Sequence, residues 1–382
     1  MRVGFGVTVL SRCLQAGGVD GIGSYVRELR QALLQRGDTE ILPVSFGTPI
    51  PDSLGKGVPG ELMPRFDVSA LVAAVTGRRF PGTARFAQKM DVFHATDHLI
   101  PRLDRVPVVA SLMDAIPLSH PEWVPSRLGP VKYALWKRTA RWAEQIITIS
   151  AFSKREIAAH FQIAPARISV IPLGVDARWF QPVPAAQLSA VRQRLDLPAR
   201  FFLFVGTLQP RKNVGRLIEA YRALPKGIRD EVPLIVVGRA GWQCQDVVDA
   251  LNRPGDARSV RWLDYLPDDD LLAVIKQATA LVFPSLCEGF GLPVLEAFAA
   301  GVPVITSQTS ALPEVAGDAA LLIDPLDPSA LSSAMLQVLE DEGLAEAMRL
   351  KGTLRAREYT WGRTAAMTVD VYRRVAGPHP AG

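Results

Sequence analysis

The sequence predicts an α/β protein made of two Rossmann-like domains, because short β-branched runs alternate with helical patterns and the whole series appears twice. Such alternation gives parallel sheets covered by helices on both faces. A chain of 382 residues is also long enough for two domains. The predicted strands are, in order, VGFGVTV, DVFHAT, VPVVASL, QIITIS and ISVIPL, then FFLFVG, PLIVVG, SVRWLDY, ALVFPS, VPVIT and ALLID.

Helical periodicity separates these strands, and a proline-containing stretch separates the two series. The predicted helices cover residues 22–35, 127–143, 154–160, 214–224, 271–278 and 292–300. The junction GVDARWFQPVPAAQ contains Pro182 and Pro184, so we expect one domain over residues 1–174 and another over 175–359. Residues 48–85 are rich in Pro and Gly and predict a variable loop or lid. Residues 360–376 predict a final amphipathic helix.

The composition excludes several classes of protein. With 48% hydrophobic and 21% charged residues, the chain can bury cores and is not disordered. No apolar run reaches the ~18 residues that a membrane-spanning helix needs. The cysteines, Cys13, Cys244 and Cys287, form no C-x-x-C motif. This argues against a zinc site or a disulfide framework and fits a reducing, cytoplasmic compartment.

Positive charge is concentrated in the first half. Residues 1–175 contain 21 Lys and Arg against 14 Asp and Glu, and the remainder contains 22 against 24. A basic half suggests an anionic partner such as nucleic acid, a phospholipid surface or a phosphorylated substrate. Many soluble domains carry such an excess, and no nucleic-acid-binding motif accompanies it, so we expect no nucleic-acid partner.

The stretch CEGFGLPVLEAFAAGVPVITS places two carboxylates around a glycine pair. The predicted strand ALVFPS precedes it, and the segment from Gly289 to Gly291 opens a helix. Backbone N–H groups at Phe290 and Gly291 are therefore expected to bind anions or sugar oxygens. Glu288 and Glu296 could each accept hydrogen bonds from a pair of vicinal hydroxyls. The alternative is that Glu288 is a solvated loop acid and Glu296 pairs locally.

A second stretch, FLFVGTLQPRKNVGRLIEAY, follows a strand with Gly206 and then two adjacent cations. Arg211 and Lys212 repel each other at the start of a helix, and a diphosphate between them would remove that repulsion. The alternative is a solvated basic turn.

A third stretch, AGGVDGIGSYVRELRQAL, has Gly21 and Gly23 at the start of a helix but has Val26 in place of a third glycine. This weakens a dinucleotide-binding interpretation.

Together these segments resemble the retaining glycosyltransferases of family 4, which have the GT-B fold. The segments are EGFGLPVLE, GVPVITS with SALPEVAGDAALLIDPLDP, VGTLQPRKN, and ITISAFSKREI with VIPLGVD. The resemblance covers nearly the whole chain, is weakest in residues 48–90, and is strongest to bacterial mannosyltransferases of O-antigen and exopolysaccharide synthesis. It implies two Rossmann-like domains facing across a deep cleft, with the helix near 360–376 returning to the first domain.

The resemblance also implies a role for each motif. Glu288, Phe290 and Gly291 would bind the donor sugar, and Glu296 would bind the ribose. Arg211 and Lys212 would neutralise the leaving diphosphate, approached by Gly21 and Gly23, while Gly206 and Tyr265 would complete the donor site. No metal or other cofactor is expected, because two cations and helix dipoles would stabilise the leaving group.

One position departs from the family pattern. The family often has His-Asp after the strand VPVVASL, where this chain has Met113 and Asp114. Methionine cannot donate a hydrogen bond or move a proton. If the role is required, Asp114, His94 or His98 must supply it, or the sugar supplies its own groups. We expect His94 to face the site, although a lone histidine is more often structural.

The expected reaction is the retaining transfer of a hexose, by front-face substitution, from GDP-mannose to a glycan or polyprenyl-diphosphate-linked acceptor. UDP-glucose, UDP-N-acetylglucosamine and deoxyhexose donors remain alternatives. A decayed glycosyltransferase-like subunit and a sugar-nucleotide epimerase are others, the latter lacking recognisable acid and base carboxylates. Residues 127–145 carry five basic residues and one acid and predict a helix on the inner face of the plasma membrane, or one that packs on the sheet.

Overall fold

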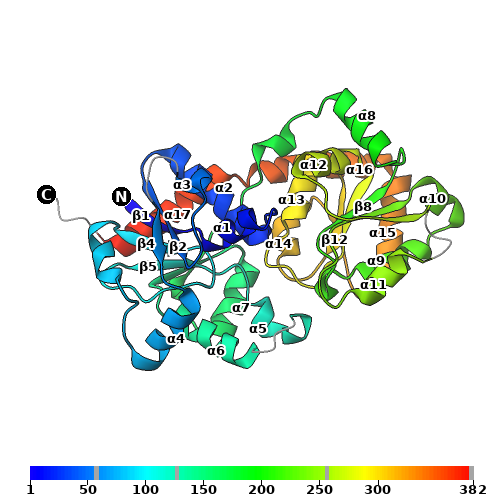
Figure 1. Ribbon diagram of the computed structural model, residues 1–382. Coiled ribbons are helices and arrows are strands. Elements are labelled where there is room, and N and C mark those ends of the chain that lie inside the picture. Colours follow the sequence, from blue (N-terminus) through cyan, green and yellow to red (C-terminus); the bar gives the residue numbers. More distant parts are fainter. Residues whose placement is uncertain (56–59, 125–128, 254–257, 378–382) are drawn as a thin grey trace. The chain divides into compact units, whose positions relative to one another are not determined.

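The computed structural model describes residues 1–55, 60–124, 129–253 and 258–377, and its contacts divide the chain into two compact units (Figure 1). The first unit comprises the chain up to Gly174 together with the part from Trp361 onwards. The second comprises Val175–Thr360, and a short segment around Trp123 groups with it.

The first unit contains a seven-stranded parallel sheet in the order β3-β2-β1-β4-β5-β6-β7. Val3 of β1 pairs with Ile41 of β2 on one side and with Val92 of β4 on the other. The strands before β4 are added on one side of β1 and the later strands on the other, so the strand order reverses between β1 and β4. The strands are β1 (Arg2–Gly6), β2 (Glu40–Phe46), β3 (Glu61–Met63), β4 (Val92–Ala95), β5 (Val108–Ser111), β6 (Gln145–Thr148) and β7 (Ile168–Val170). The helices are α1 (Thr8–Gln15), α2 (Gly21–Arg36), α3 (Asp52–Gly55), α4 (Phe66–Thr76), α5 (Ile116–Ser119), α6 (Gly129–Ala140), α7 (Ala151–Phe161) and α17 (Trp361–Ala376).

The second unit contains a six-stranded parallel sheet in the order β10-β9-β8-β11-β12-β13. Here the strand order reverses between β8 and β11. Ligands of open α/β sheets bind at such a topological switch point. The strands are β8 (Phe202–Val205), β9 (Leu234–Val237), β10 (Val260–Leu263), β11 (Ala280–Phe283), β12 (Val304–Ser307) and β13 (Leu321–Ile323). The helices are α8 (Ala185–Arg194), α9 (Val214–Arg222), α10 (Lys226–Glu231), α11 (Gln245–Leu251), α12 (Asp268–Gln277), α13 (Leu292–Ala299), α14 (Leu312–Ala316), α15 (Pro328–Glu340) and α16 (Glu342–Arg357).

The eleven predicted strands are all present, but the expectation of a loop over residues 48–85 is wrong. Strand β3 pairs with β2 at the edge of the first sheet, and α4 follows it. Helix α4 escapes a periodicity search because both of its faces are apolar: Phe66, Ala70 and Ala73 are buried, while aliphatic side chains of the same helix are exposed. Strand β2 was missed as well, because Pro43 interrupts its pattern.

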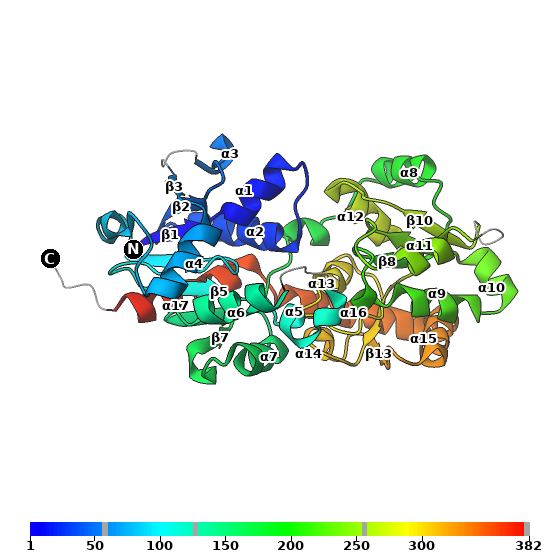
Figure 2. The ribbon, with the colours of Figure 1, turned by 60° about the horizontal axis from the view of Figure 1, so that its bottom comes forward.

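The last helix, α17, packs on the first unit. It lies along α2 and beside β4 and β5 (Figures 1 and 2). The Thr364 hydroxyl donates a hydrogen bond of 2.8 Å to the Pro172 carbonyl oxygen, and the ring of Trp361 lies 6.3 Å from that of Tyr25. The sheet of the first unit is therefore completed by a helix from the far end of the chain.

The predicted basic helix over residues 127–145 is shorter than expected. Helix α6 ends at Ala140, and residues 127 and 128 lie outside the described residues. The two tryptophans of this segment are partly buried against the core of the unit: Trp136 stacks on His98 with ring centroids 4.0 Å apart, and Trp142, beyond the end of α6, meets Phe80 edge-on at 6.1 Å. This packing favours the alternative for the segment, and the membrane-surface interpretation of residues 127–145 stays a prediction.

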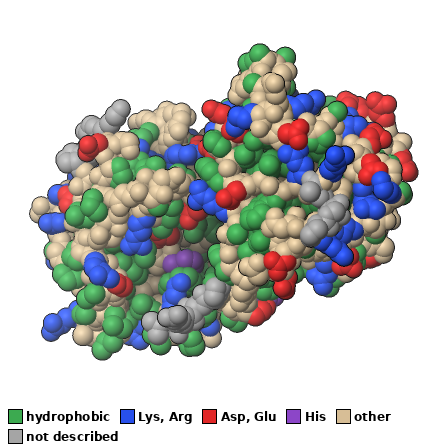
Figure 3. All heavy atoms as spheres, turned by 45° about the vertical axis from the view of Figure 1, so that its right-hand side comes forward, with side chains coloured by type: hydrophobic (Ala, Val, Ile, Leu, Met, Phe, Trp, Pro, Cys, Tyr) green, Lys and Arg blue, Asp and Glu red, His purple; other side chains and the backbone are tan. Residues whose placement is uncertain are grey.

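Basic side chains are dispersed on the face shown in Figure 3, where lysines and arginines are scattered among apolar and acidic residues. Within the described ranges, no helix combines the length and apolar character that crossing a bilayer requires.

Candidate active site

Two loops of the second unit bring the predicted cations and acid together. Arg211 and Lys212 belong to a short 3-10 turn after β8, and Glu288 follows β11. Because β8 and β11 are neighbours in the sheet, the loops at their carboxyl ends lie side by side. The Leu286 N–H also donates a hydrogen bond of 2.7 Å to the Arg211 carbonyl oxygen, which ties the two loops together.

Glu288 forms ion pairs with both cations. Its carboxylate oxygens accept hydrogen bonds from Arg211 Nη1 at 2.5 Å and from Lys212 Nζ at 2.6 Å. Glu288 and Lys212 are only 7% and 8% exposed, so the charges interact in a poorly solvated environment. We name Arg211, Lys212 and Glu288 the ion triad.

The environment of the ion triad shifts the pKa values of its members. Burial alone would raise the pKa of Glu288, but Arg211 and Lys212 outweigh burial and lower that pKa well below its usual range. Burial lowers the pKa of Lys212, and Arg211 lowers it further, against the opposing attraction of Glu288. The acid is therefore ionised at neutral pH, and the lysine depends on it as a counter-charge.

Several supporting residues had not been predicted from the sequence. Asn213 has a φ of 60°, and its amide donates hydrogen bonds to the carbonyl oxygens of Pro284 at 3.0 Å and Pro325 at 2.7 Å. The Glu288 N–H donates to Ser310 Oγ at 3.0 Å, and the Lys212 ammonium lies 4.6 Å from the ring centre of Phe283. The asparagine after the two cations was an available signal, since asparagine tolerates left-handed backbone.

The glycine pair opens helix α13 as predicted. Gly291 has a φ of 119°, and a Cβ there would lie 2.8 Å from Leu312 Cδ2, so the position requires glycine. No side chain caps this helix end, where Pro293 has no N–H and the Val294 N–H donates to the Gly291 carbonyl oxygen, so an anion or a sugar oxygen would be bound by the N–H groups before Pro293. Phe290 is buried, with its ring against Tyr359, and so it can contribute to binding only through its backbone.

Glu296 lies about one turn into α13 and is held without an ion-pair partner among the described residues. Burial raises its pKa to about 7; Arg178 opposes this rise, while Asp268 and Asp176 add to it. A partly buried carboxylate that has no ion-pair partner is suited to a ligand whose hydroxyl groups donate hydrogen bonds to it.

Gly206 and Tyr265 follow β8 and β10 at the same edge of the second sheet. Gly206 has a φ of 151°, and a Cβ there would lie 3.6 Å from Lys212 Cε, beside the ion triad. Tyr265 is 48% exposed, and the Arg239 guanidinium lies 4.3 Å from its ring centre. An aromatic face backed by an arginine is a suitable platform for a planar base.

In the first unit, Gly21 and Gly23 begin helix α2, which follows β1 and α1. The N-cap residue Asp20 accepts a hydrogen bond of 2.7 Å from the Gly23 N–H. A Cβ at Gly23 would lie 2.9 Å from Val19 Cγ1, whereas at Gly21 it would meet open space. A side chain at Gly23 would thus have to displace Val19, whereas Gly21 leaves the helix terminus accessible.

His94 does not face a ligand site, and that expectation is wrong. It is fully buried in β4, where Nδ1 is 2.7 Å from the Tyr372 hydroxyl and Nε2 is 2.8 Å from Ser111 Oγ. The Tyr25 hydroxyl lies 2.6 Å from the same Ser111 oxygen. Burial lowers the pKa of His94 to about 3, so the ring is neutral and joins α17 to the sheet.

Two further acids of the first unit lie at the carboxyl ends of β4 and β5. Asp114 accepts a hydrogen bond of 3.0 Å from the Ile116 N–H at the start of α5. Asp97, which had not been predicted, accepts from the Leu99 N–H at 2.6 Å. Burial raises the pKa of Asp97 to about 6. Among the described residues, no cluster of three or more His, Cys, Asp or Glu side chains forms a metal site.

We expect His94→Phe to destabilise the fold by about 1–3 kcal/mol, because it leaves the Tyr372 hydroxyl without its imidazole partner. Since the folded-state pKa of His94 is lowered, its contribution to stability is present above pH 6.5 and is lost as the pH falls towards 3. Urea unfolding at several pH values measures both effects. His160→Phe, on the partly exposed side of α7, is the control. Equal pH dependence of wild type and His94→Phe would contradict the buried-neutral assignment.

Comparison with known proteins matches both units. Residues 189–355 match the family model described as glycosyl transferases group 1, and residues 19–179 match glycosyltransferase family 4. The O-antigen chain mannosyltransferase B of Escherichia coli is 34% identical over 285 residues, which cover 74% of each chain. The serotype-specific mannosyltransferase WbdA of Escherichia coli is 28% identical over 61% of this chain but only 29% of its own length.

The fold also matches solved structures. The Anabaena protein Alr3699/HepE, solved in complex with UDP-glucose, superposes with a TM-score of 0.74 at 19% identity, covering 97% of this chain and 99% of that one.

Proposed function

Because the chain belongs to glycosyltransferase family 4, we propose that it transfers a mannosyl residue from GDP-mannose, with retention of configuration and without a metal ion. The observation that carries this proposal is the position of the ion triad, which lies where the strand order of the second sheet reverses between β8 and β11. The mannosyltransferase names of the relatives favour mannose as the donor sugar. UDP-sugars and deoxyhexose donors are the alternatives, and the UDP-glucose complex of the Anabaena protein favours testing UDP-glucose first among them.

In the proposed reaction, Arg211 and Lys212 bind the diphosphate of the donor. The bond from the anomeric carbon to the phosphate oxygen breaks, and the electron pair leaves with the phosphate. The acceptor hydroxyl oxygen bonds to the same face of that carbon, and its proton passes to the leaving phosphate oxygen. The two cations stabilise the negative charge that develops on the leaving group.

Glu288 is proposed to accept hydrogen bonds from sugar hydroxyls while it remains close to Lys212. Glu296 is proposed to bind the ribose diol, and the ring of Tyr265 to stack with the base. The roles suggested by the resemblance for Gly21, Gly23 and Asp114 of the first unit stay predictions, as does the replacement of the usual histidine by Met113.

The proposed acceptor is a glycan or a lipid-diphosphate-linked oligosaccharide of a bacterial surface polysaccharide, in keeping with the named role of the O-antigen relative. A lipid-linked acceptor would place the enzyme at a membrane surface. A decayed, non-catalytic subunit is the second candidate, and it is favoured by Met113 alone.

A thermal-shift panel of GDP, UDP, ADP and dTDP with their sugar conjugates, with and without EDTA, tests the donor. We expect one base to raise the Tm by several degrees at saturation, unchanged by EDTA. Arg211→Ala should reduce this shift, because it removes a charge that binds the diphosphate. Arg200→Ala, an exposed arginine paired with Glu231 in the same unit, is the matched control.

Product analysis separates the proposals. NMR of the anomeric centre should show the configuration of the donor, and inversion would contradict the front-face reaction. A shift that requires a divalent metal would overturn metal independence. No shift with any nucleotide would favour the decayed-subunit alternative.

A further inference from the structure

Helix α4 of the first unit presents a row of aliphatic side chains to solvent. Val68, Leu71, Val72 and Val75 are 59%, 55%, 47% and 77% exposed. Their spacing of three, four and seven residues from Val68 places them on one face of the helix. We name these residues the α4 stripe. Exposed apolar surface of this kind marks a place where a soluble unit meets a partner or a lipid phase.

The elements beside α4 continue this character. Helices α4 and α6 lie side by side (Figures 1 and 2), and Val131 of α6 is 65% exposed. At the start of α4, Arg65 pairs with Asp67, so this end of the helix has no net charge. The neighbouring helix thus adds one more exposed aliphatic side chain beside α4.

The other end of α4 is strongly basic. Arg78 and Arg79 are exposed directly after the helix, and Arg102 Nη1 donates a hydrogen bond of 2.6 Å to the Gly77 carbonyl oxygen that follows its last turn. Arg79 and Arg102 border a pocket of about 580 Å³. We name it the arginine pocket; its charged lining residues are Arg79, Arg102, Arg105, Arg141 and Glu144.

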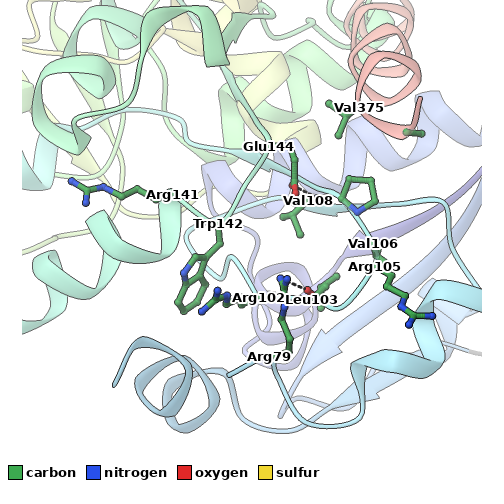
Figure 4. A pocket seen from close by; sticks show the side chains of 12 residues that line it. Arg79, Arg102, Leu103, Arg105, Val106, Val108, Arg141, Trp142, Glu144 and Val375 are labelled. Atoms are coloured by element: carbon green, nitrogen blue, oxygen red, sulfur yellow. Dashed lines mark hydrogen bonds between the residues drawn. The ribbon is translucent and has the colours of Figure 1, made fainter. Parts of the chain in front are cut away.

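The arginine pocket has donors left for a ligand. Figure 4 shows Arg79 and Arg102 reaching towards Trp142, with Arg105 and Arg141 extending outwards. Arg79 Nη1 donates to the Leu103 carbonyl oxygen at 2.8 Å, and a guanidinium has five N–H donors in all. The one acid in this lining, Glu144, already accepts a hydrogen bond of 2.6 Å from the Val108 N–H. The pocket is thus suited to phosphate oxygens.

We propose that the α4 stripe and the arginine pocket together dock the first unit on an anionic phospholipid bilayer. The aliphatic side chains enter the boundary between headgroups and acyl chains, while the arginines bind lipid phosphates. The composition favours lipid over a protein partner, because cores of protein interfaces are enriched in aromatic residues and Met, and the stripe contains only Val and Leu. The α4 stripe is distinct from Trp136 of α6, whose ring stacks on His98.

Docking would bring the enzyme to a lipid-linked acceptor, and in this respect it rests on the proposed function. The surface itself is tested without any transfer reaction. Flotation of the full chain with vesicles of phosphatidylcholine containing about one third phosphatidylglycerol should recover the protein in the lipid fraction at about 0.05 M salt. Phosphatidylcholine alone, or about 0.5 M salt, should reduce the recovery.

The variant Val68→Ser/Leu71→Ser/Val72→Ser/Val75→Ser should lower the vesicle partition coefficient about tenfold or more. The matched control is Leu326→Ser/Leu350→Ser/Leu354→Ser, which removes leucines of the second unit that are 54–62% exposed. It should float as the wild type does. Arg78→Gln/Arg79→Gln should weaken binding to the anionic vesicles and reduce its salt dependence, with Arg349→Gln/Lys351→Gln as its control.

Three results would overturn the proposal. They are no flotation of the wild type, flotation that is unchanged in the α4 variant, and a dimer in light scattering that the α4 variant abolishes while no vesicle binding is seen. A Val75→Trp reporter gives a second measurement: brominated lipids should quench it more than a Leu350→Trp reporter. Equal quenching of the two reporters would count against insertion of α4. Flotation without nucleotide-induced stabilisation would support docking and contradict the proposed transfer reaction.

Discussion

Replacing Glu288 by alanine should destabilise the protein by about 3–5 kcal/mol, because it leaves Lys212 buried next to Arg211 without their shared counter-charge. For a unit of this size, the loss corresponds to a fall in Tm of roughly 6–20 °C. Transfer activity should be lost as well. Urea unfolding and a thermal-shift assay measure the stability.

Glu288→Gln separates charge from shape. In this variant the buried ammonium of Lys212 has a folded-state pKa lowered further from 10.5, so the folded state binds fewer protons than the unfolded state and stability should rise between pH 8 and 10. In the wild type the lowered pKa of Glu288 stabilises the fold above pH 4.5, and this contribution is lost as the pH falls below that value. Glu231→Ala, which breaks the exposed pair with Arg200, should cost less than about 1 kcal/mol. Equal losses in the two alanine variants would contradict a buried ion triad.

Replacing Glu296 by glutamine should have the opposite effect on stability. Its folded-state pKa is raised from 4.5 to about 7, so its ionisation opposes folding increasingly between these pH values and fully above pH 7. Glutamine imitates the protonated form. At pH 8 the variant should therefore be more stable than the wild type by about 3 kcal/mol, and the difference should disappear near pH 4.

The same variant should bind the nucleotide about 10–100-fold more weakly, because a neutral amide replaces a charged acceptor of ribose hydroxyls. If the ionised form binds the diol, nucleotide binding by the wild type at pH 7 should release about half a proton per chain, because Glu296 is about half protonated there. Calorimetry in buffers of different ionisation enthalpy detects that proton. Glu346→Gln on the surface of α16 should change stability by less than about 0.5 kcal/mol. A pH-independent difference at Glu296 would refute its raised pKa.

The sequence was sufficient for every described strand except β2 and β3, and for the residues of the ion triad. The motifs after β8 and β11 identify Arg211, Lys212 and Glu288 individually, because each lies at the carboxyl end of a predicted strand. The pairing was not predictable: a diphosphate was expected between the cations, yet the Glu288 carboxylate contacts both. Which loop side chains meet depends on sheet order and backbone angles, as with the left-handed Asn213.

Two failures have a physical cause in common. Helix α4 was missed because an apolar stripe on its solvent side hides the helical period, and His94 was misplaced because a histidine in a strand has no pattern that separates inward from outward. In both cases the chain breaks the rule that apolar side chains point in and polar ones point out. The exposed apolar side chains of α4 mark a surface that a partner would cover, and the buried His94 marks a hydrogen-bond network inside the first unit.

The return of α17 to the first unit makes the second unit an insertion within the first. During synthesis from the amino terminus, Val175–Thr360 is made before Trp361–Ala376, which supplies the last helix of the first unit. The hydrogen bond between the His94 imidazole and the Tyr372 hydroxyl can therefore form only after the last helix has been made. The strands and helices of the second unit all come from one continuous stretch of the chain. The first unit therefore cannot complete its fold until the end of the chain has been made, although most of its residues are made first.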